Sequence, residues 1–205
     1  MDKIVEIERK CGVAHVKFLS GDTLKIPSAL FLERKLREGE MIDPEAYRAF
    51  MLQRGYPHAL EAAMKFLALR ERSEKEIWQR LRRSCYDEMT IVRVMETLSL
   101  HSLVSDERFA EQWVHHRGKK YGKNRIAQEL RIKGVEGEEA RKALEALPEE
   151  EEYQRALEQA KKLRKRMDDP PKIVQALIRR GYSWSMAKRA VDELQRRSKE
   201  WSKNP

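Results

Sequence analysis

Apolar positions recur along the chain in three similar segments with the spacing of amphipathic helices. Each segment starts at an isoleucine, followed four residues later by a leucine. A second apolar stripe follows at offsets 14, 17, 18 and 21 from each isoleucine, which trace one face of a helix. A third stripe lies upstream and begins at Ala62, Phe109 and Ala156, 47 residues apart each time. The isoleucines are Ile77, Ile126 and Ile173. The pattern predicts three repeats of three short helices.

Capping residues mark the ends of these helices. Ser73, with Glu76 three residues later, forms a capping box, and Asp169 precedes a proline suited to the first turn. Asp87 and Ser183 cap the third helices of the first and third repeats, whereas Glu136 is a poorer cap in the second. Gly134 and Gly181 stand where the second helices must end in a left-handed conformation. Cys85 occupies that place in the first repeat, so we expect a looser helix end there.

The first 28 residues differ from the rest and read as short strands, with Gly21 and Asp22 as a hairpin turn. Helices are expected over residues 29–37 and 44–54, the second ending at Gly55. We therefore predict a mainly all-α fold whose three tandem repeats form an elongated arrangement. The predicted divisions are an N-terminal segment of strands then helices at 1–58, repeats at 59–104, 105–150 and 151–199, and a tail at 200–205.

Charge is concentrated at one end of the chain. The 205 residues contain 43 Lys and Arg against 34 Asp and Glu, and residues 153–205 alone carry a net charge of +9. Such a concentration suggests a polyanion or an acidic protein surface as partner. We expect no membrane span and no signal peptide, which predicts a cytoplasmic protein with Cys11 and Cys85 as reduced thiols.

Motifs for catalysis or metal binding are missing from the sequence. It has no glycine-rich phosphate loop, no paired metal-ligand motif and no nucleophile elbow. His115 and His116 are adjacent, so they point to different faces of a helix and cannot chelate one ion together. We predict no catalytic residues, no metal and no cofactor, and hence a protein that is not an enzyme.

Three basic regions are the candidates for a binding site. The first is a loop in the second repeat with an aromatic residue that could stack on a base: Arg117, Lys119, Lys120, Tyr121, Lys123 and Arg125. The second lies on the first helix of the third repeat: Lys161, Lys162, Lys165 and Arg166. The third lies in the last two helices: Arg179, Arg180, Lys188 and Arg189, with Arg196, Arg197 and Lys199 beyond. The alternative is a flexible connector in the first case and solvated helix faces in the others.

Three further features allow a structural or a functional interpretation. Arg70, Arg117 and Arg164 share one offset, and a cation near a helix C-terminus is favoured by the helix dipole. Trp184 could be a hydrophobic staple or an exposed anchor. The acidic run at residues 149–152 is expected to be a solvated helix start.

Two stretches carry a resemblance to a known family. Leu69-Arg70-Glu71-Arg72-Ser73-Glu74-Lys75-Glu76-Ile77 with Leu81 resembles the first-repeat signature of the RecX regulatory proteins. The second-repeat signature is similar to Asp106-Glu107-Arg108-Phe109-Ala110 followed by Gly122, Ile126, Glu129-Leu130 and Lys133-Gly134-Val135. The three-repeat layout and the strand-like N-terminus match as well, so the resemblance covers nearly the whole chain. Cys85 departs from it, because glycine is more usual at that position.

The resemblance implies a non-enzymatic modulator of the RecA recombinase. RecX-like proteins bind in the helical groove of the filament that RecA forms on single-stranded DNA, and they lower its ATPase, strand-exchange and co-protease activities. The resemblance implies that the protein, as a monomer, binds the RecA filament and single-stranded DNA within or near it. The alternative is a direct DNA-binding protein that uses its three-helix modules like helix-turn-helix units; an enzyme is the third possibility.

Overall fold

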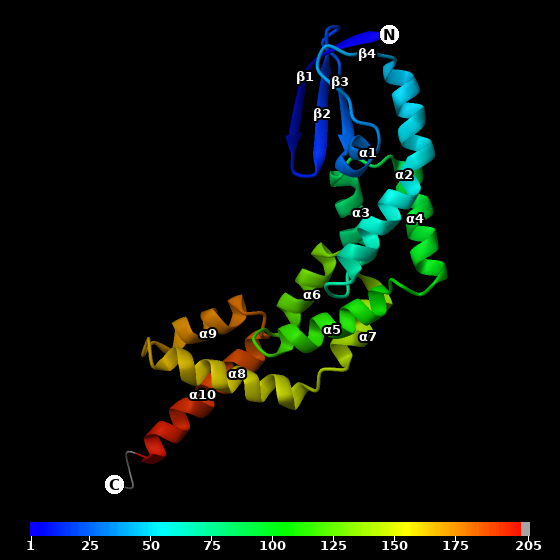
Figure 1. Cartoon of the computed structure of the whole chain (residues 1–205). Helices are drawn as coiled ribbons and strands as arrows, with labels where there is room; N and C mark the ends of the chain where they lie inside the picture. Colours follow the sequence, from blue (N-terminus) through cyan, green and yellow to red (C-terminus); the bar gives the residue numbers. More distant parts are fainter. Residues whose placement is uncertain (202–205) are drawn as a thin grey trace. The chain divides into compact units, whose positions relative to one another are not determined.

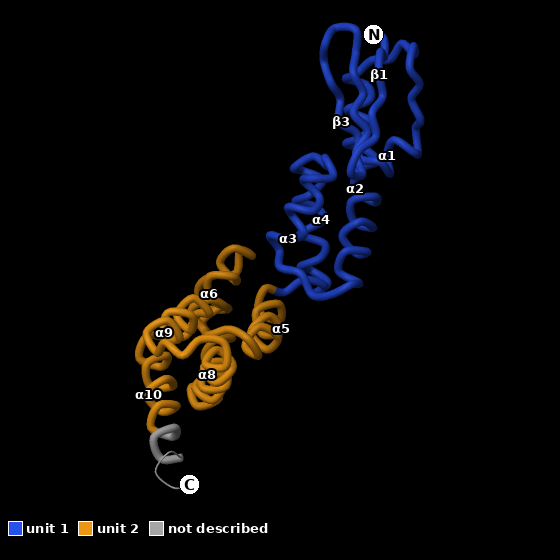
Figure 2. Tube along the Cα trace, turned by 90° about the vertical axis from the view of Figure 1, so that its left-hand side faces the viewer, with its two compact units in different colours: residues 1–105 blue, residues 106–205 orange. Residues whose placement is uncertain are grey.

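The protein is described from a computed structural model, which gives the backbone of residues 1–201 and the side chains of residues 1–196. Two compact units divide the chain, residues 1–105 and residues 106–205 (Figure 2). The predicted tail at 200–205, and the side chains of Arg197 and Lys199, lie outside the described residues.

The first unit begins with a small antiparallel sheet. Its strands are β1 (Asp2–Lys10), β2 (Val13–Phe18), β3 (Thr23–Pro27) and β4 (Met41–Ile42), in the order β3-β2-β1-β4. The predicted turn at Gly21 and Asp22 joins β2 to β3, with Gly21 at φ +95°. The turn at Cys11 and Gly12, and the short strand β4, were not predicted.

Four helices complete the first unit: α1 (Ser28–Glu33), α2 (Pro44–Leu67), α3 (Glu74–Arg83) and α4 (Glu88–Leu100) (Figure 1). The helix expected over residues 29–37 is therefore shorter than predicted. One hydrophobic core joins the sheet to these helices, from Ile4 and Val16 to Ile77 and Leu98.

The predicted helix end at Gly55 was wrong, because α2 continues through Gly55 and Pro57 to Leu67. Gly55 is buried, and a Cβ there would lie 3.4 Å from the Oγ1 atom of Thr90. The glycine therefore allows α2 to approach α4 closely rather than ending a helix. The first helix of the first repeat is the second half of α2, so the predicted boundary at residue 58 falls inside a helix.

The second unit consists of six helices within residues 106–201. They are α5 (Asp106–Gly118), α6 (Lys123–Ile132), α7 (Gly137–Glu145), α8 (Glu149–Arg164), α9 (Pro170–Arg179) and α10 (Trp184–Trp201). Helices α5 to α7 enclose one hydrophobic core, and α8 to α10 enclose another. The tandem three-helix repeats and the mainly helical fold are thereby confirmed. The elongated arrangement of the whole chain stays a prediction.

The predicted caps are confirmed by their hydrogen bonds. The side chains of Ser73, Asp87, Asp169 and Ser183 each accept a hydrogen bond from a backbone amide in the first turn, whereas Glu136 accepts none. Each such bond satisfies one of the amides that a helix start leaves unpaired.

The three second helices end in the same way. Cys85, Gly134 and Gly181 have φ values of +61°, +87° and +91°. In each turn, the amide of the next residue donates to the carbonyl five positions before it, as in Tyr86 to Leu81 and Tyr182 to Leu177. The turn at Cys85 has both hydrogen bonds of the glycine turns, from Cys85 to Arg82 and from Tyr86 to Leu81. That this helix end is looser stays a prediction.

Candidate binding surface

Two of the three basic regions come together in the second unit. The loop between α5 and α6 lies against the turn between α9 and α10 (Figure 1). The amide of Gly122 donates to the carbonyl of Arg180 at 2.9 Å, and the amide of Asn124 donates to that of Gly181 at 3.1 Å. The cations of the loop and those beside the turn therefore belong to one surface, which we call the composite surface and define as Lys119, Lys120, Lys123, Arg125, Arg179, Arg180 and Lys188.

Two glycines allow this close approach of one backbone to another. A Cβ on Gly122 would lie 2.4 Å from the carbonyl oxygen of Gly181, and a Cβ on Gly181 would lie 2.4 Å from the backbone nitrogen of Arg125. Real Cβ atoms are not found at such distances, so each glycine is required by the contact between the second and third repeats. Gly181 meets a second requirement, since its φ of +91° lies in the left-handed region that disfavours side chains.

A carboxylate from α8 fixes the same junction. Helix α6 begins after Gly122, which has no side chain with which to cap it. The Oε1 atom of Glu152 accepts instead from the amide of Lys123 at 2.8 Å, and Glu152 is 5% exposed. A buried anion at a helix N-terminus is stabilised both by the hydrogen bond and by the helix dipole. The prediction of a solvated acidic run is therefore wrong for Glu152, although Glu149, Glu150 and Glu151 are exposed.

Three of the predicted loop residues are engaged within the fold. The guanidinium of Arg117 pairs with both carboxylate oxygens of Glu129, and Arg125 pairs with the same carboxylate at 3.3 Å. Both guanidinium carbons lie 4.2 Å from the ring centroid of Tyr121. Tyr121 and Arg117 therefore hold α5 against α6, while Lys119 and Lys120 are exposed and Lys123 is half-buried.

The pKa values at Glu129 reflect this pairing. Burial raises the pKa of the Glu129 carboxyl, but hydrogen bonds from Arg117 and Arg125 outweigh it, so the pKa falls below its ordinary value of 4.5. The hydrogen bond to Glu129 likewise raises the pKa of Arg117. Glu129 belongs to the second-repeat signature but was not predicted as part of a site, because an acidic residue on a helix beside a basic loop is an ordinary pattern.

The repeated arginine has a structural role in each repeat. Arg70 donates to both carboxylate oxygens of Glu76, at 3.1 and 3.0 Å, as Arg117 does to Glu129. The third, Arg164, donates to the backbone carbonyl of Leu194 at 3.0 Å. Each arginine thus ties the first helix of its repeat to a later one, which is a more specific role than a favourable interaction with the helix dipole.

The second basic region is separate from the composite surface. Lys161, Lys162, Lys165 and Arg166 are all exposed near the end of α8. Glu152, which contacts Lys123, lies nine residues before Lys161 on that helix, which corresponds to about 14 Å at 1.5 Å per residue. Residues 161–166 therefore form a second patch, which we call the α8 patch.

The third basic region includes a cation beside an exposed aromatic ring. Arg179 and Lys188 are exposed, and the Nζ atom of Lys188 lies 5.1 Å from the ring centroid of Trp184. Trp184 is 62% exposed, so it is not a staple. Arg189 instead lies over the ring of Tyr153 at 4.0 Å, which ties α10 to α8.

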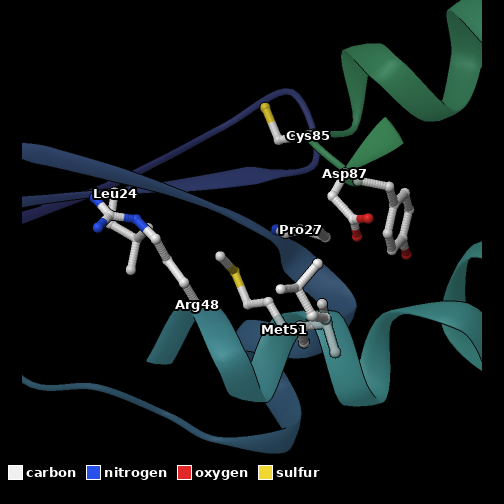
Figure 3. A pocket seen from close by; sticks show the side chains of 9 residues that line it. Leu24, Pro27, Arg48, Met51, Cys85 and Asp87 are labelled. Atoms are coloured by element: carbon white, nitrogen blue, oxygen red, sulfur yellow. The ribbon is translucent and has the colours of Figure 1, made fainter. Parts of the chain in front are cut away.

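A small apolar pocket lies within the first unit (Figure 3). It has a volume of about 240 Å³ and lies between β3, α2 and the turn between α3 and α4. Its lining includes Leu24, Met51 and Cys85, with Arg48 and Asp87 also among the lining residues. No sequence pattern indicates this pocket, because its walls come from segments some sixty residues apart.

Within the described residues there is no group of three His, Cys, Asp or Glu side chains placed to hold a metal ion. Each helix of that part of the chain is also too short or too polar to cross a membrane. Both cysteines are free thiols, Cys11 exposed and Cys85 partly buried.

Comparison with known proteins identifies the family. A model of the first three-helix domain of RecX matches residues 59–98, and a model of the second matches residues 105–144. A regulatory protein RecX of Mycolicibacterium smegmatis is 37% identical over 141 residues, which cover 63% of this chain and 75% of that protein. The chain belongs to the RecX family of regulatory proteins.

The similarity to RecX proteins extends over nearly the full chain. A regulatory protein RecX of Clostridium perfringens is 26% identical over 205 residues, which cover 95% of this chain and 97% of that protein. A crystal structure of a regulatory protein RecX, 22% identical, covers 94% of this chain and 100% of its own with a TM-score of 0.63, which supports the same fold. The resemblance seen in the two sequence signatures is thereby confirmed.

Proposed function

We propose that this chain regulates the RecA recombinase by binding the RecA–single-stranded DNA filament. Binding lies in the helical groove of the filament and lowers the ATPase, strand-exchange and co-protease activities. The observation that carries the proposal is membership of the RecX regulatory family, with both RecX domain models matched in order along the chain. The protein acts as a cytoplasmic monomer without a catalytic site of its own.

The geometry of the second unit supports this proposal. Backbone hydrogen bonds and the buried Glu152 hold the second and third repeats together, so their cations are presented at fixed positions. The α8 patch begins about 14 Å along α8 from Glu152, which contacts the composite surface at Lys123. Two basic patches at that separation can meet DNA phosphates or acidic side chains on different parts of a filament. Simultaneous contacts raise the effective concentration of each and restrict motion between protomers.

The alternative of a helix-turn-helix-like DNA reader has less support. The third helix of the second repeat begins with Gly137, Glu138 and Glu139, and both glutamates are exposed. Carboxylates at the start of such a helix repel the phosphates that a groove-binding helix must approach. The three repeats therefore do not present equivalent recognition helices.

A direct test is the ATPase activity of RecA on single-stranded DNA, measured with and without the protein at sub-stoichiometric ratios. We expect inhibition that weakens as the salt concentration rises, because exposed cations make the contact. Unchanged ATPase activity at an equimolar ratio and low salt would refute the proposal. A parallel measurement of binding to the same DNA without RecA separates filament recognition from DNA binding alone.

A further inference from the structure

Trp184 stands out among the aromatic side chains of the protein. It is the one Trp, Tyr or Phe side chain that is exposed within residues 1–196, at 62%. Ile178, at the end of α9, is also 40% exposed. A single exposed apolar side chain is ordinary at a protein surface; the feature that distinguishes this ring is the cation beside it, Lys188.

The start of α10 does not require an aromatic residue there. Ser183 caps this helix, because its side chain accepts from the amide of Met186 at 3.2 Å and its carbonyl accepts from the amide of Ala187. The staple positions on either side are held by Tyr182 and Ala187, which are both buried. The equivalent residues of the first and second repeats are Glu88 and Gly137, so the repeat architecture forms without the ring.

In the stretch of sequence around Trp184, residues 170–191, every charged side chain is positive. Residues 170–191 contain five cations and no acidic residue. The corresponding residues 123–144 of the second repeat contain four glutamates, two of them in the first turn of α7. These residues of the third repeat therefore differ from their counterparts in having both an exposed ring and no acidic side chain, although Asp169 and Asp192 flank them in the chain.

Cations of the second repeat extend this surface. Gly181, three residues before Trp184, contacts the backbone of Asn124 and Arg125. The ammonium of Lys188 lies 5.1 Å from the ring centroid of Trp184, where a phosphate next to a stacked base would find a counter-charge. An aromatic face flanked by cations is the arrangement by which proteins hold single strands, with bases on the ring and phosphates on the charges.

We infer that Trp184 is the base-stacking centre of a single-stranded nucleic-acid site, with the composite surface contacting the phosphates on either side. The site shares the composite surface with the proposed regulation of RecA, but it belongs to the free protein and needs no filament, so binding of a single strand without RecA tests it separately. It recognises unpaired bases without sequence preference, since every base offers a flat face to the ring.

The test is binding of a fluorescent oligothymidylate to the full chain by anisotropy at low salt, without RecA. Trp184→Ala should weaken binding about tenfold, and Trp184→Phe should restore most of it. The matched control is Ile132→Ala, which removes another apolar side chain, 71% exposed, from the second repeat and should leave binding unchanged. Circular dichroism checks that each variant is folded.

A strand of abasic sites isolates the stacking contact, because it keeps the phosphates and lacks the bases. The unmodified protein should bind it about tenfold more weakly than oligothymidylate, and Trp184→Ala should bind the two strands alike. The inference is overturned if the unmodified protein binds no single strand at low salt, or if Trp184→Ala keeps its preference for the strand with bases. It is also overturned if the substitution weakens binding to an acidic peptide but not to oligothymidylate, which would make the surface a protein contact.

Discussion

The turns that end the second helices of the first and third repeats have the same hydrogen bonds but different neighbours. Cys85 adopts the left-handed conformation at φ +61° and still completes the turn. Gly181 adopts φ +91° and in addition lies against the backbone of Arg125. A side chain is therefore tolerated in the first repeat at a modest cost and excluded in the third.

The difference shows that one turn can serve two purposes. In the first repeat the turn ends α3, and its cysteine lines the apolar pocket. In the third repeat the turn ends α9 and also joins that repeat to α6, which brings the basic loop beside Trp184 and Arg179. The binding surface of the second unit thus depends on a contact between repeats that no single repeat contains.

The sharpest way to break the contact between the repeats is Gly181→Ala. The new Cβ would lie 2.4 Å from a backbone nitrogen and occupy a left-handed conformation, so we expect a loss of about 3 kcal/mol in the free energy of unfolding. Urea unfolding measures the loss, and hydrogen exchange at α6 locates it. The control is Gly21→Ala, which has a similar φ of +95° with open space around it and should cost only about 1 kcal/mol. Equal losses in both variants would contradict a role for close approach.

Glu129→Gln tests the clamp that positions the basic loop. We expect the free energy of unfolding to fall by about 2 kcal/mol at neutral pH, since the hydrogen bonds from two arginines lose their charged acceptor. The pKa of Glu129 is lowered from 4.5 in the folded protein. Its ionised form therefore stabilises the fold above that pH, and this contribution is lost as the pH falls through the lowered value.

The stability difference between Glu129→Gln and the unmodified protein should therefore shrink on acidification below the ordinary pKa of 4.5. Glu136→Gln is the control, because that glutamate is exposed and makes no capping hydrogen bond. A difference that stays constant down to acid denaturation would mean that the charge of Glu129 plays no part.

Helix capping offers a third comparison between repeats. Asp87→Ala should lower the free energy of unfolding by about 1 kcal/mol, because it removes the hydrogen bond that the amide of Thr90 donates to the Asp87 side chain. In the second repeat Glu136 has extended backbone angles but no cap, so Glu136→Asp should stabilise the protein by about 0.5 kcal/mol. Thermal unfolding of both variants measures the two changes in stability. A loss of stability in Glu136→Asp would show that the start of α7 cannot accept a cap.

The smallest expected effect is at Cys85. Cys85→Gly removes a side chain from the left-handed region and should stabilise the first unit by about 0.5 kcal/mol. The measurement is the urea midpoint under reducing conditions. A clear loss of stability would mean that the cysteine side chain contributes more through its burial beside Tyr86 than its backbone conformation costs.

The sequence patterns predicted the repeats and most helix ends, because these depend on local spacing and capping. The stripes from Ile77, Ile126 and Ile173 are buried as expected, and four predicted caps form. Gly55 was misinterpreted, since a glycine that ends a helix and one that admits a neighbouring helix look alike in sequence.

The candidate surface was only partly predictable. The basic regions were identified, but their convergence depends on the approach of Gly122 to Gly181 and on Glu152, which come from three segments far apart in the chain. Arg117 and Tyr121 were placed among the binding residues because a charged aromatic loop suits phosphate contact. The pairing of Arg117 with Glu129 and its contact with the ring of Tyr121 are tertiary features that no local pattern indicates.

The central claim is that the basic surface of the second unit contacts the RecA filament. The most direct measurement is inhibition of RecA ATPase activity on single-stranded DNA by two charge-reversed proteins. One changes Lys119, Lys120 and Lys123 to Glu, and a second reverses the α8 patch at Lys161, Lys162, Lys165 and Arg166. The control changes the exposed Lys10, Lys25 and Lys35 of the first unit to Glu, which alters the net charge as much as the loop variant does. We predict weaker inhibition and a flatter salt dependence for both second-unit variants, and unchanged inhibition for the control. Full inhibition by both second-unit variants at physiological salt would contradict the claim and place the contact on another face of the repeats.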